Sequence, residues 1–450
     1  MGGACITRPE RTTVALARGR AVEVFGYARP VIDPTAPEHL SLPAPSPARG
    51  SFEPGFEPVA RTFAQHLATR QEVGASLCIT HRGRTVVDVW GGLADVSSKR
   101  PWEASTRINV FSVTKGLAAI ALHLLADRGK LDWSAPVASY WPGFARAGKG
   151  EMSVATLLGH RGGLAYLDAP LGLSDCIDPS KAPRILDALE AQRPAWTPGT
   201  DQGYHALTFG MYAAELFRRI AGESMGTFLR RELFAPLGSD AHLGTPASED
   251  RFLATLYPPS TGARVAKMIA SALLFPQSTE SFVARATVKR DSIGRRAFLN
   301  PKADLPGGVG AYNSVAVRRV EMPWGNATAS ARGIARAYLP FAQGGAHAGR
   351  TYLREATIAP AYQRTGWSER DLVLQKPLGW THGFLKEERH VFSPVVESFG
   401  HAGMGGALGW CDPVHQLTIG YVMNRMDFRV RSPRALALCH ALYECEPLRG

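Results

Sequence analysis

Two side chains suited to acyl transfer lie close together in residues 109–129, which read "NVFSVTKGLAAIALHLLADRG". Lys115 follows Ser112 at the spacing that puts two residues on one face of a helix, so its amine can reach the serine hydroxyl. The apolar periodicity predicts that this helix begins at Ser112, after the extended run "RINVF". The positive end of a helix favours a neutral amine, and a neutral amine can accept the serine proton. The pattern therefore indicates a nucleophile, its base, and free backbone N–H groups that can hold an oxyanion.

The S-x-x-K spacing also occurs by chance, and serine is a frequent helix N-cap, so a purely structural role is the alternative for this motif taken alone. No other lysine of the chain has a serine three residues before it. Tyr204 lies in "PGTDQGYHALTFG", ahead of an amphipathic helix, and a phenol close to a lysine can relay a proton to a leaving group. His401 lies in "FGHAGMGG", where glycines allow a substrate to approach the backbone closely.

These motifs, in this order, resemble those of the serine β-lactamase-like superfamily. They are most similar to those of the family VIII carboxylesterases, which are relatives of class C β-lactamases and of penicillin-binding peptidases. The resemblance extends over residues 55–445 and includes "VVDVWGGLAD", "ATLLGHRGGL", "RELFAPLG" and "FGHAGMGGALGW". It implies an α/β domain beside a mostly helical domain, with the active site in the cleft between them.

The resemblance also implies roles for individual residues. Ser112 would be the nucleophile, and Lys115 and Tyr204 would act as a coupled pair of proton carriers, with the order of their action left open. The backbone N–H groups of Ser112 and Met404 would form the oxyanion hole. The residues expected to bind substrate are His401, Ala402, Gly403, His205 and Ala206.

Two departures from the β-lactamase pattern bear on the substrate. Residues 204–206 read Tyr-His-Ala instead of Tyr-x-Asn, so the amide that would hold a lactam side chain is absent. Residues 401–403 read His-Ala-Gly instead of Lys-Thr-Gly, and a neutral imidazole anchors a carboxylate more weakly than an ammonium does. We therefore expect a serine hydrolase that cleaves short-chain carboxylic esters through an acyl-enzyme. A β-lactamase, a D-amino-acid peptidase or an acyltransferase on the same site is an alternative, as is a non-catalytic, penicillin-binding-like sensor.

Three other motifs have ordinary structural explanations. "GESMG", residues 222–226, matches the G-x-S-x-G nucleophile motif, but that motif needs a strand before the serine and here a helix precedes it. Gly222 is instead expected to end that helix, and Ser224 to cap the next one. Tyr312 lies in an irregular segment, and His160 of "HRG" precedes Tyr204, so both are expected to be structural.

The elements around these motifs predict an α+β fold, an α/β sandwich of the β-lactamase type. A helix in residues 56–73 precedes a hairpin in residues 74–92, and strands in residues 398–426 precede a closing helix that starts at Ser432 and Pro433. One antiparallel sheet built from both ends of the chain, with flanking helices and an inserted helical domain, accounts for this order. The expected domains are a leader or linker (1–54), a sheet domain (55–110 and 331–450) and a mostly helical domain (111–330) with an irregular insertion (245–330).

Composition excludes several other classes of protein. The 450 residues contain neither an apolar run of about 18 residues nor an N-terminal secretory signal, so we expect a cytoplasmic protein without a membrane span. The six cysteines and 13 histidines lack metal-ligand spacing, so free thiols are expected, with no metal and no cofactor. The net charge of +12 is spread along the chain without a nucleic-acid-binding motif, which favours a small ester substrate over a nucleic acid.

Overall fold

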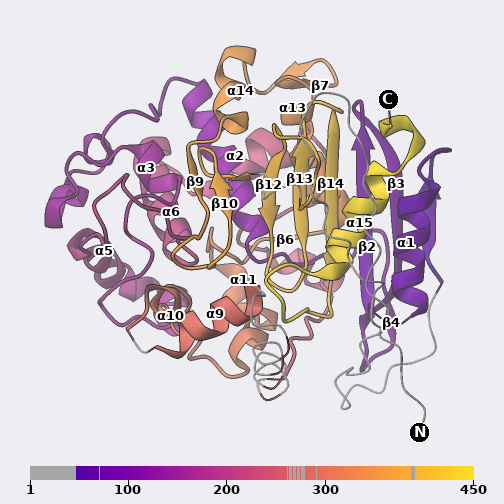
Figure 1. Ribbon diagram of the computed structural model, residues 1–450, viewed down its shortest axis with the longest axis horizontal. Helices are drawn as coiled ribbons and strands as arrows, with labels where there is room; N and C mark the ends of the chain where they lie inside the picture. Colours follow the sequence, from indigo (N-terminus) through magenta and orange to yellow (C-terminus); the bar gives the residue numbers. More distant parts are fainter. Residues whose placement is uncertain are drawn as a thin grey trace, which may run out of the picture. The chain divides into compact units, whose positions relative to one another are not determined.

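Strands from the two ends of the chain pair directly in one antiparallel sheet (Figure 1). The computed structural model describes residues 47–449 except 70, 261, 263–265, 267–269, 271–273, 275–278, 290 and 387–390, all within the compact unit Leu42–Gly450. β2 (Gly74–His81) lies between β3 (Arg84–Asp95) and β14 (Leu417–Met423) and pairs antiparallel with both.

The other strands of this sheet extend it in both directions. They are β1 (Arg49–Phe52), β4 (Arg100–Pro101), β9 (Gly366–Ser368), β10 (Leu378–Trp380), β11 (Leu385–Lys386), β12 (Phe399–Ala402) and β13 (Leu408–Asp412). Within the described residues the sheet has ten strands in the order β1-β3-β2-β14-β13-β12-β11-β10-β9, with β4 paired to β3. β12, which carries His401, pairs with its sequence neighbours β11 and β13, and the pairing of β14 with β2 joins this C-terminal part of the sheet to the N-terminal strands.

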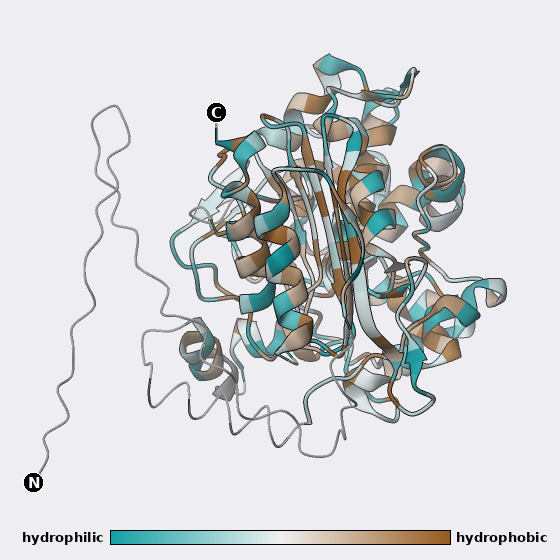
Figure 2. Ribbon diagram, turned by 90° about the vertical axis from the view of Figure 1, so that its right-hand side faces the viewer, coloured by the Kyte–Doolittle hydropathy of each residue, from teal (hydrophilic) through white to brown (hydrophobic). Residues whose placement is uncertain are grey.

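Alternating side chains of the central strands face two layers of helices. Leu417, Ile419 and Tyr421 of β14 belong to a core shared with α1 (Glu57–Ala68) and α15 (Pro433–Tyr443), which pack on each other. Figure 2 looks onto this side, where the two helices lie side by side in front of the sheet. Val422 faces the opposite core, with α2 (Val113–Asp127), α12 (Ala331–Ala337) and α13 (Leu339–Ala342). The predicted α+β sandwich is confirmed.

The remaining helices and strands lie mostly beside this sandwich, and most of them are short (Figure 1). β5 (Ile108–Asn109) pairs with β6 (Thr328–Ala329), just before the predicted nucleophile. The described residues of the segment 245–330 form short helices, turns and, close to its end, β6. The other elements are α3 (Val154–Leu158), α4 (Leu173–Ile177), α5 (Ala182–Ala191), α6 (Thr208–Ala221), α7 (Met225–Leu229), α9 (Thr279–Val288), α10 (Ile293–Leu299), α11 (Val315–Arg319), α14 (Glu355–Tyr362), β7 (Ala346–His347) and β8 (Arg350–Thr351).

Local signals explain where the predicted elements begin and end. α15 starts at Pro433, directly after Ser432, because proline fits the first turn of a helix, where its missing N–H costs nothing. The hairpin of β2 and β3 turns at Arg82 and Gly83, both with positive φ. The turn between β13 and β14 is held by the Asp412 carboxylate, which accepts the N–H of Val414 at 3.0 Å. These elements were predicted in the places where they occur.

One expectation about the leader is wrong. Residues Arg49–Phe52, which composition places in the leader, form β1 and pair with β3 at the edge of the sheet. All four residues are exposed, and an edge strand without a buried face has no hydrophobic alternation to display in the sequence. Residues 1–46 of the predicted leader lie outside the described residues, and the boundaries of the other two domains stay a prediction.

Among the described residues, none of the helices combines the length and the apolar composition needed to cross a bilayer. Cys78, Cys176, Cys411, Cys439 and Cys445 are free thiols, and all but Cys176 are buried. Cys5 lies outside the described residues.

Candidate active site

The backbone at Ser112 differs from that of an ordinary helix N-cap. Phe111 has a left-handed φ of 46°, which is costly for an aromatic residue, at the point where β5 gives way to α2. Ser112 itself already has helical angles (φ −65°, ψ −8°), and its side chain caps no backbone N–H. Ser224, by contrast, has extended angles and accepts the N–H of Thr227, as an N-cap does. The Ser112 hydroxyl is therefore available to other partners.

Lys115 is the first of these partners. Its Nζ lies at hydrogen-bonding distance from Ser112 Oγ, 3.1 Å, and donates to the Trp324 carbonyl oxygen at 2.7 Å. The side chain is fully buried, and no ion pair with a carboxylate forms there among the described residues. Burial therefore lowers the pKa of the Lys115 ammonium well below its ordinary value. A neutral amine in this position offers its lone pair to the serine proton.

Tyr204 is the second partner, because its phenol donates to Ser112 Oγ at 2.9 Å. Its ring is stacked on that of Trp380 in β10, with the centroids 5.5 Å apart and the planes inclined by 8°. Burial raises the pKa of the Tyr204 phenol above its ordinary value, and the hydrogen bond with Ser112 offsets part of that rise. The structure thus brings Ser112, Lys115 and Tyr204 together around one oxygen atom.

β12 carries His401 to the same region. Its ring is buried, 6.1 Å from the Tyr204 ring between centroids, and its Nδ1–H donates to the Ala402 carbonyl oxygen at 2.9 Å. Burial, together with the nearby Lys115, lowers the pKa of the His401 imidazole well below its ordinary value. His401 is therefore neutral, and its Nε2 has no hydrogen-bond partner within the described residues.

The residues after Ala402 lie against the chain that leads into Ser112. A Cβ atom on Gly403 would be only 2.4 Å from the Val110 carbonyl oxygen, so glycine is required for this close approach. Met404 follows, with its side chain 38% exposed. Within the part of the chain that the structure describes, the N–H groups of Ser112 and Met404 donate to no other group. Both donors are therefore available to an oxyanion, as the prediction requires.

The ring of His205 lies in the core, so its contacts give no support to the substrate-binding role predicted for this residue. It is fully buried, its Nδ1–H donates to the Gly203 carbonyl oxygen at 2.7 Å, and its Nε2 accepts the N–H of Leu164 at 3.0 Å. These internal hydrogen bonds use both ring nitrogens. Its backbone N–H donates to Nδ1 of His160 at 2.9 Å, in keeping with the structural role expected for His160. Ala206 is also buried, in the core that contains Tyr204.

The motifs set aside as structural contact other groups. Ser224 Oγ donates to Glu321 at 2.6 Å, and Gly222 ends α6 with a φ of 74°. The Tyr312 ring packs on Phe111 at 5.1 Å between centroids, but its phenol forms no hydrogen bond with Ser112 Oγ among the described contacts. Ser224 is therefore held as the N-cap of α7 by Thr227 and Glu321, and the phenol that contacts Ser112 Oγ is that of Tyr204.

Sequence reasoning missed Asp371, which holds the backbone of Tyr204. One oxygen of this fully buried carboxyl group accepts three backbone N–H groups, those of Tyr204 at 3.1 Å and of Val373 and Leu374 at 2.9 Å each. Burial raises the pKa of Asp371 to about 6, although these hydrogen bonds oppose the rise. Asp371 lies 167 residues from Tyr204 in a turn without a motif, so nothing local in the sequence signals its contact.

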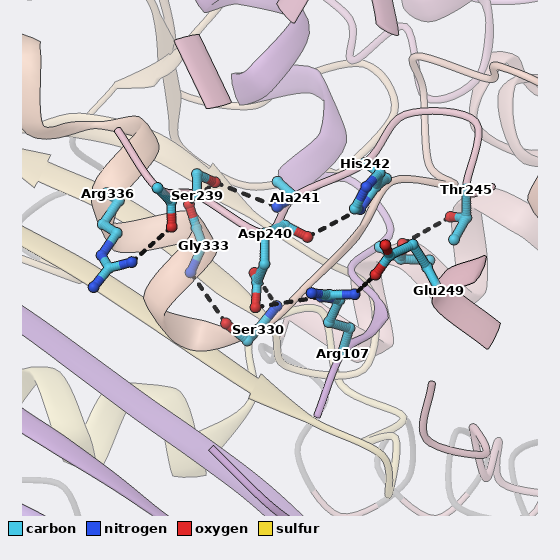
Figure 3. Close-up of polar contacts among 12 residues, drawn as sticks. Arg107, Ser239, Asp240, Ala241, His242, Thr245, Glu249, Ser330, Gly333 and Arg336 are labelled. Atoms are coloured by element: carbon cyan, nitrogen blue, oxygen red, sulfur yellow. Dashed lines mark hydrogen bonds and ion pairs between the residues drawn. The ribbon is translucent and has the colours of Figure 1, made fainter. Parts of the chain in front are cut away.

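A polar network fixes the chain at the start of β5, shortly before Ser112 (Figure 3). The Arg107 guanidinium pairs with Asp240 at 3.3 Å and with Glu249. Asp240 accepts the N–H of Ser330 at 3.1 Å, and the Ser330 hydroxyl accepts the N–H of Gly333 at 3.1 Å as the N-cap of α12. Because α12 packs on β2 and β14, the network connects the segment before Ser112 to the central strands of the sheet.

Comparison with known proteins assigns the chain to a family. The Beta-lactamase family model matches residues 59–441, so the chain belongs to the β-lactamase family. It is similar to the esterase/beta-lactamase LipL of Mycobacterium tuberculosis, with 33% identity over 382 residues that cover 84% of this chain and 83% of LipL.

Solved structures agree with this assignment. The crystal structure of a family VIII carboxylesterase has a TM-score of 0.76 and 33% identity and covers 88% of this chain and 99% of its own. A penicillin-binding protein homologue from Caulobacter crescentus has a TM-score of 0.75 and 31% identity, with coverage of 88% and 99%. The predicted resemblance is confirmed, and the protein is an enzyme of the β-lactamase-like hydrolase superfamily.

Proposed function

We propose that this enzyme is a serine carboxylesterase that hydrolyses short-chain esters through an acyl-enzyme on Ser112. The observation that carries the proposal is the pair of hydrogen bonds at Ser112 Oγ, one with a buried amine at 3.1 Å and one with a buried phenol at 2.9 Å. Burial lowers the pKa of Lys115 and raises that of Tyr204, which favours a free amine beside a protonated phenol. Such a pair supplies a base for the attack and an acid for the departure of the alcohol.

The proton movements balance over the two half-reactions. In acylation, the Ser112 proton moves to Lys115 Nζ while Oγ bonds to the ester carbonyl carbon, and the carbonyl oxygen becomes an oxyanion held by the N–H groups of Ser112 and Met404. The bond to the alcohol then breaks, the departing oxygen takes the Tyr204 proton, and the proton on Lys115 replaces it. Water attacks the acyl-enzyme by the reverse route, which releases the carboxylic acid and restores the Ser112 hydroxyl.

Two features favour neutral esters over β-lactams as substrates. His401 is buried with a lowered pKa, so the H-x-G segment presents no positive charge to a carboxylate. Ala206 replaces the amide that would hold a lactam side chain. The family VIII carboxylesterase with the same fold supports ester hydrolysis, whereas the name of LipL, esterase/beta-lactamase, includes both activities. β-Lactam hydrolysis, peptide cleavage and acyl transfer would use the same acyl-enzyme and differ in the substrate or in the attacking group.

A substrate comparison tests the proposal. We expect kcat/KM for p-nitrophenyl acetate or butyrate to be far above that for nitrocefin, and benzylpenicillin to be left intact. A preference for nitrocefin over every short ester would contradict it. Stoichiometric labelling by a β-lactam without turnover of any ester would identify a non-catalytic sensor instead.

A further inference from the structure

We infer that Phe298 of α10 forms the surface that binds the alcohol group of the ester, an inference that rests on the proposed ester hydrolysis. Phe298 is a large apolar residue with 39% of its surface exposed, and its ring centroid lies 6.5 Å from that of Tyr204. Leu299 follows it in α10 and is 51% exposed. The helix thus presents apolar surface next to the phenol that donates to Ser112 Oγ.

α10 is held firmly against the loop that carries Tyr166 and Asp168. The Arg296 guanidinium lies 3.6 Å from the centroid of the Tyr166 ring and also pairs with Asp168. At the end of the helix, the Asn300 amide donates to the carbonyl oxygens of Leu167 at 2.7 Å and Ala169 at 2.8 Å. The apolar surface is therefore formed before a ligand arrives, which reduces the entropy lost on binding.

The position of Tyr204 indicates which part of the ester meets this surface. In the tetrahedral intermediate, Ser112 Oγ and the leaving oxygen are bonded to the same carbon atom. A phenol that hydrogen-bonds to Ser112 Oγ can therefore reach the leaving oxygen, and the proposed mechanism requires it to protonate that oxygen. The alcohol group must then extend along Tyr204, toward the ring that packs beside it. A benzyl group is large enough to contact Phe298, whereas a methyl group is too small.

The test compares alcohols at a constant acyl group. Methyl butyrate and benzyl butyrate give the same butyryl-enzyme, so a difference between them in kcat/KM reports only the alcohol. We expect Phe298→Ala to lower kcat/KM for benzyl butyrate about tenfold and for methyl butyrate less than about twofold, with a smaller loss for Phe298→Leu. Phe52→Ala is the matched control, because Phe52 is 47% exposed on β1, at the opposite edge of the sheet from β9 and beyond four intervening strands from β12.

Each outcome has a defined meaning. Two results for Phe298→Ala would overturn the assignment of Phe298. One is an equal loss of kcat/KM for both butyrates, and the other is a loss that follows the acyl length in benzyl acetate, butyrate and hexanoate. In either case, ester hydrolysis by the unchanged enzyme would still support the proposed function. A complete lack of ester hydrolysis by the unchanged enzyme would overturn both.

Discussion

At the scale of single residues, burial gives Lys115 and Tyr204 opposite preferences for a proton. Desolvation disfavours the charged form of each group, so it lowers the pKa of the amine and raises the pKa of the phenol. Lys115 Nζ also lies 5.2 Å from the centroid of the Tyr204 ring, so the charge of either group acts on the other. Since both groups contact the same serine oxygen, we propose that they titrate and transfer protons as one system.

This coupling predicts non-additive losses of activity. Lys115→Ala, Tyr204→Phe and the double variant should each lower kcat/KM for p-nitrophenyl butyrate by a similar large factor, about 10²–10⁴. Tyr204→Phe retains the ring that stacks on Trp380, so its loss reports the hydroxyl rather than the packing. Steady-state kinetics with thermal melts of each variant check the result. If the two single losses multiply in the double variant, the residues do not share a step.

The sequence predicts these three residues because each lies in a motif of fixed order around a recognisable helix start. It gives no signal for the burial of the His205 ring or for Asp371, since the contacts with Leu164 and Tyr204 join groups that only the folded chain brings close. The ring nitrogens of His205 bond to Gly203 and Leu164 in the core, and the carboxyl group of Asp371 reaches Tyr204 from a distant turn. Gly203 is local to His205, but the contact of His205 with Leu164 and that of Asp371 with Tyr204 have no counterpart in local spacing.

At the scale of elements, the turn that begins at Asp371 fixes the loop that carries Tyr204. One carboxyl oxygen of Asp371 links the two segments through the backbone, so the loop depends on this side chain. The same turn approaches α10, where a Cβ atom on Gly294 would be 3.3 Å from the Val373 carbonyl oxygen. The turn that begins at Asp371 therefore contacts both the loop of Tyr204 and the helix of the proposed alcohol-binding surface.

We expect Asp371→Asn to change the pH dependence of the free energy of unfolding. Burial raises the pKa of Asp371 from 3.8 to about 6, so the folded protein binds its proton more tightly than the unfolded chain does. The contribution of this group to the free energy of unfolding is then largest at low pH and is lost as the pH rises through about 6. Asp371→Asn keeps an acceptor oxygen but does not titrate.

Urea denaturation at pH 7 and pH 4 measures this effect. The wild-type protein should gain stability relative to Asp371→Asn as the pH falls, by about 2–3 kcal/mol over that interval. A difference that stays constant between the two pH values, or that changes in the opposite direction, would contradict the burial argument for Asp371.

Long or strongly patterned elements are predictable from the sequence, and short ones are not. α2, the hairpin of β2 and β3, and α15 all carry periodicity together with a start or turn signal. β1 is an exposed edge strand and α10 has only seven residues, too few to show a periodic pattern. α10, which carries Phe298, is therefore not predictable from the sequence, because the position of a short helix depends on tertiary contacts.

At the scale of the whole molecule, a buried ion pair connects the ends of two central strands, β2 and β14, to the loop that follows Met404. The Arg434 guanidinium, 6% exposed, pairs with the fully buried carboxylate of Glu72. It also donates to the carbonyl oxygens of Arg425 at 2.7 Å and Gly405 at 3.4 Å. One side chain of α15 therefore supports the start of β2, the end of β14 and the predicted oxyanion loop.

Loss of this arginine should destabilise the protein strongly. Arg434→Leu leaves the Glu72 charge buried without its partner and should lower the free energy of unfolding by about 3–5 kcal/mol. Addition of Glu72→Gln to that variant should recover part of the loss, because the uncompensated charge is then removed. Arg49→Ala is the control, since Arg49 forms an exposed pair with Glu103 at 3.5 Å and its loss should cost less than about 1 kcal/mol. Chemical denaturation that gives equal losses for Arg434→Leu and Arg49→Ala would contradict this role.

The central claim is that Ser112 becomes acylated, and identification of the residue that reacts with a fluorophosphonate tests it most directly. Ser112 has a buried amine at 3.1 Å, whereas Ser224 donates to Glu321 and caps α7. After tryptic digestion, mass spectrometry should therefore find the adduct on the peptide that contains Ser112, and Ser112→Ala should abolish both the adduct and ester hydrolysis. Ser224→Ala should leave both in place. An adduct on Ser224, or full ester hydrolysis by Ser112→Ala, would contradict the account.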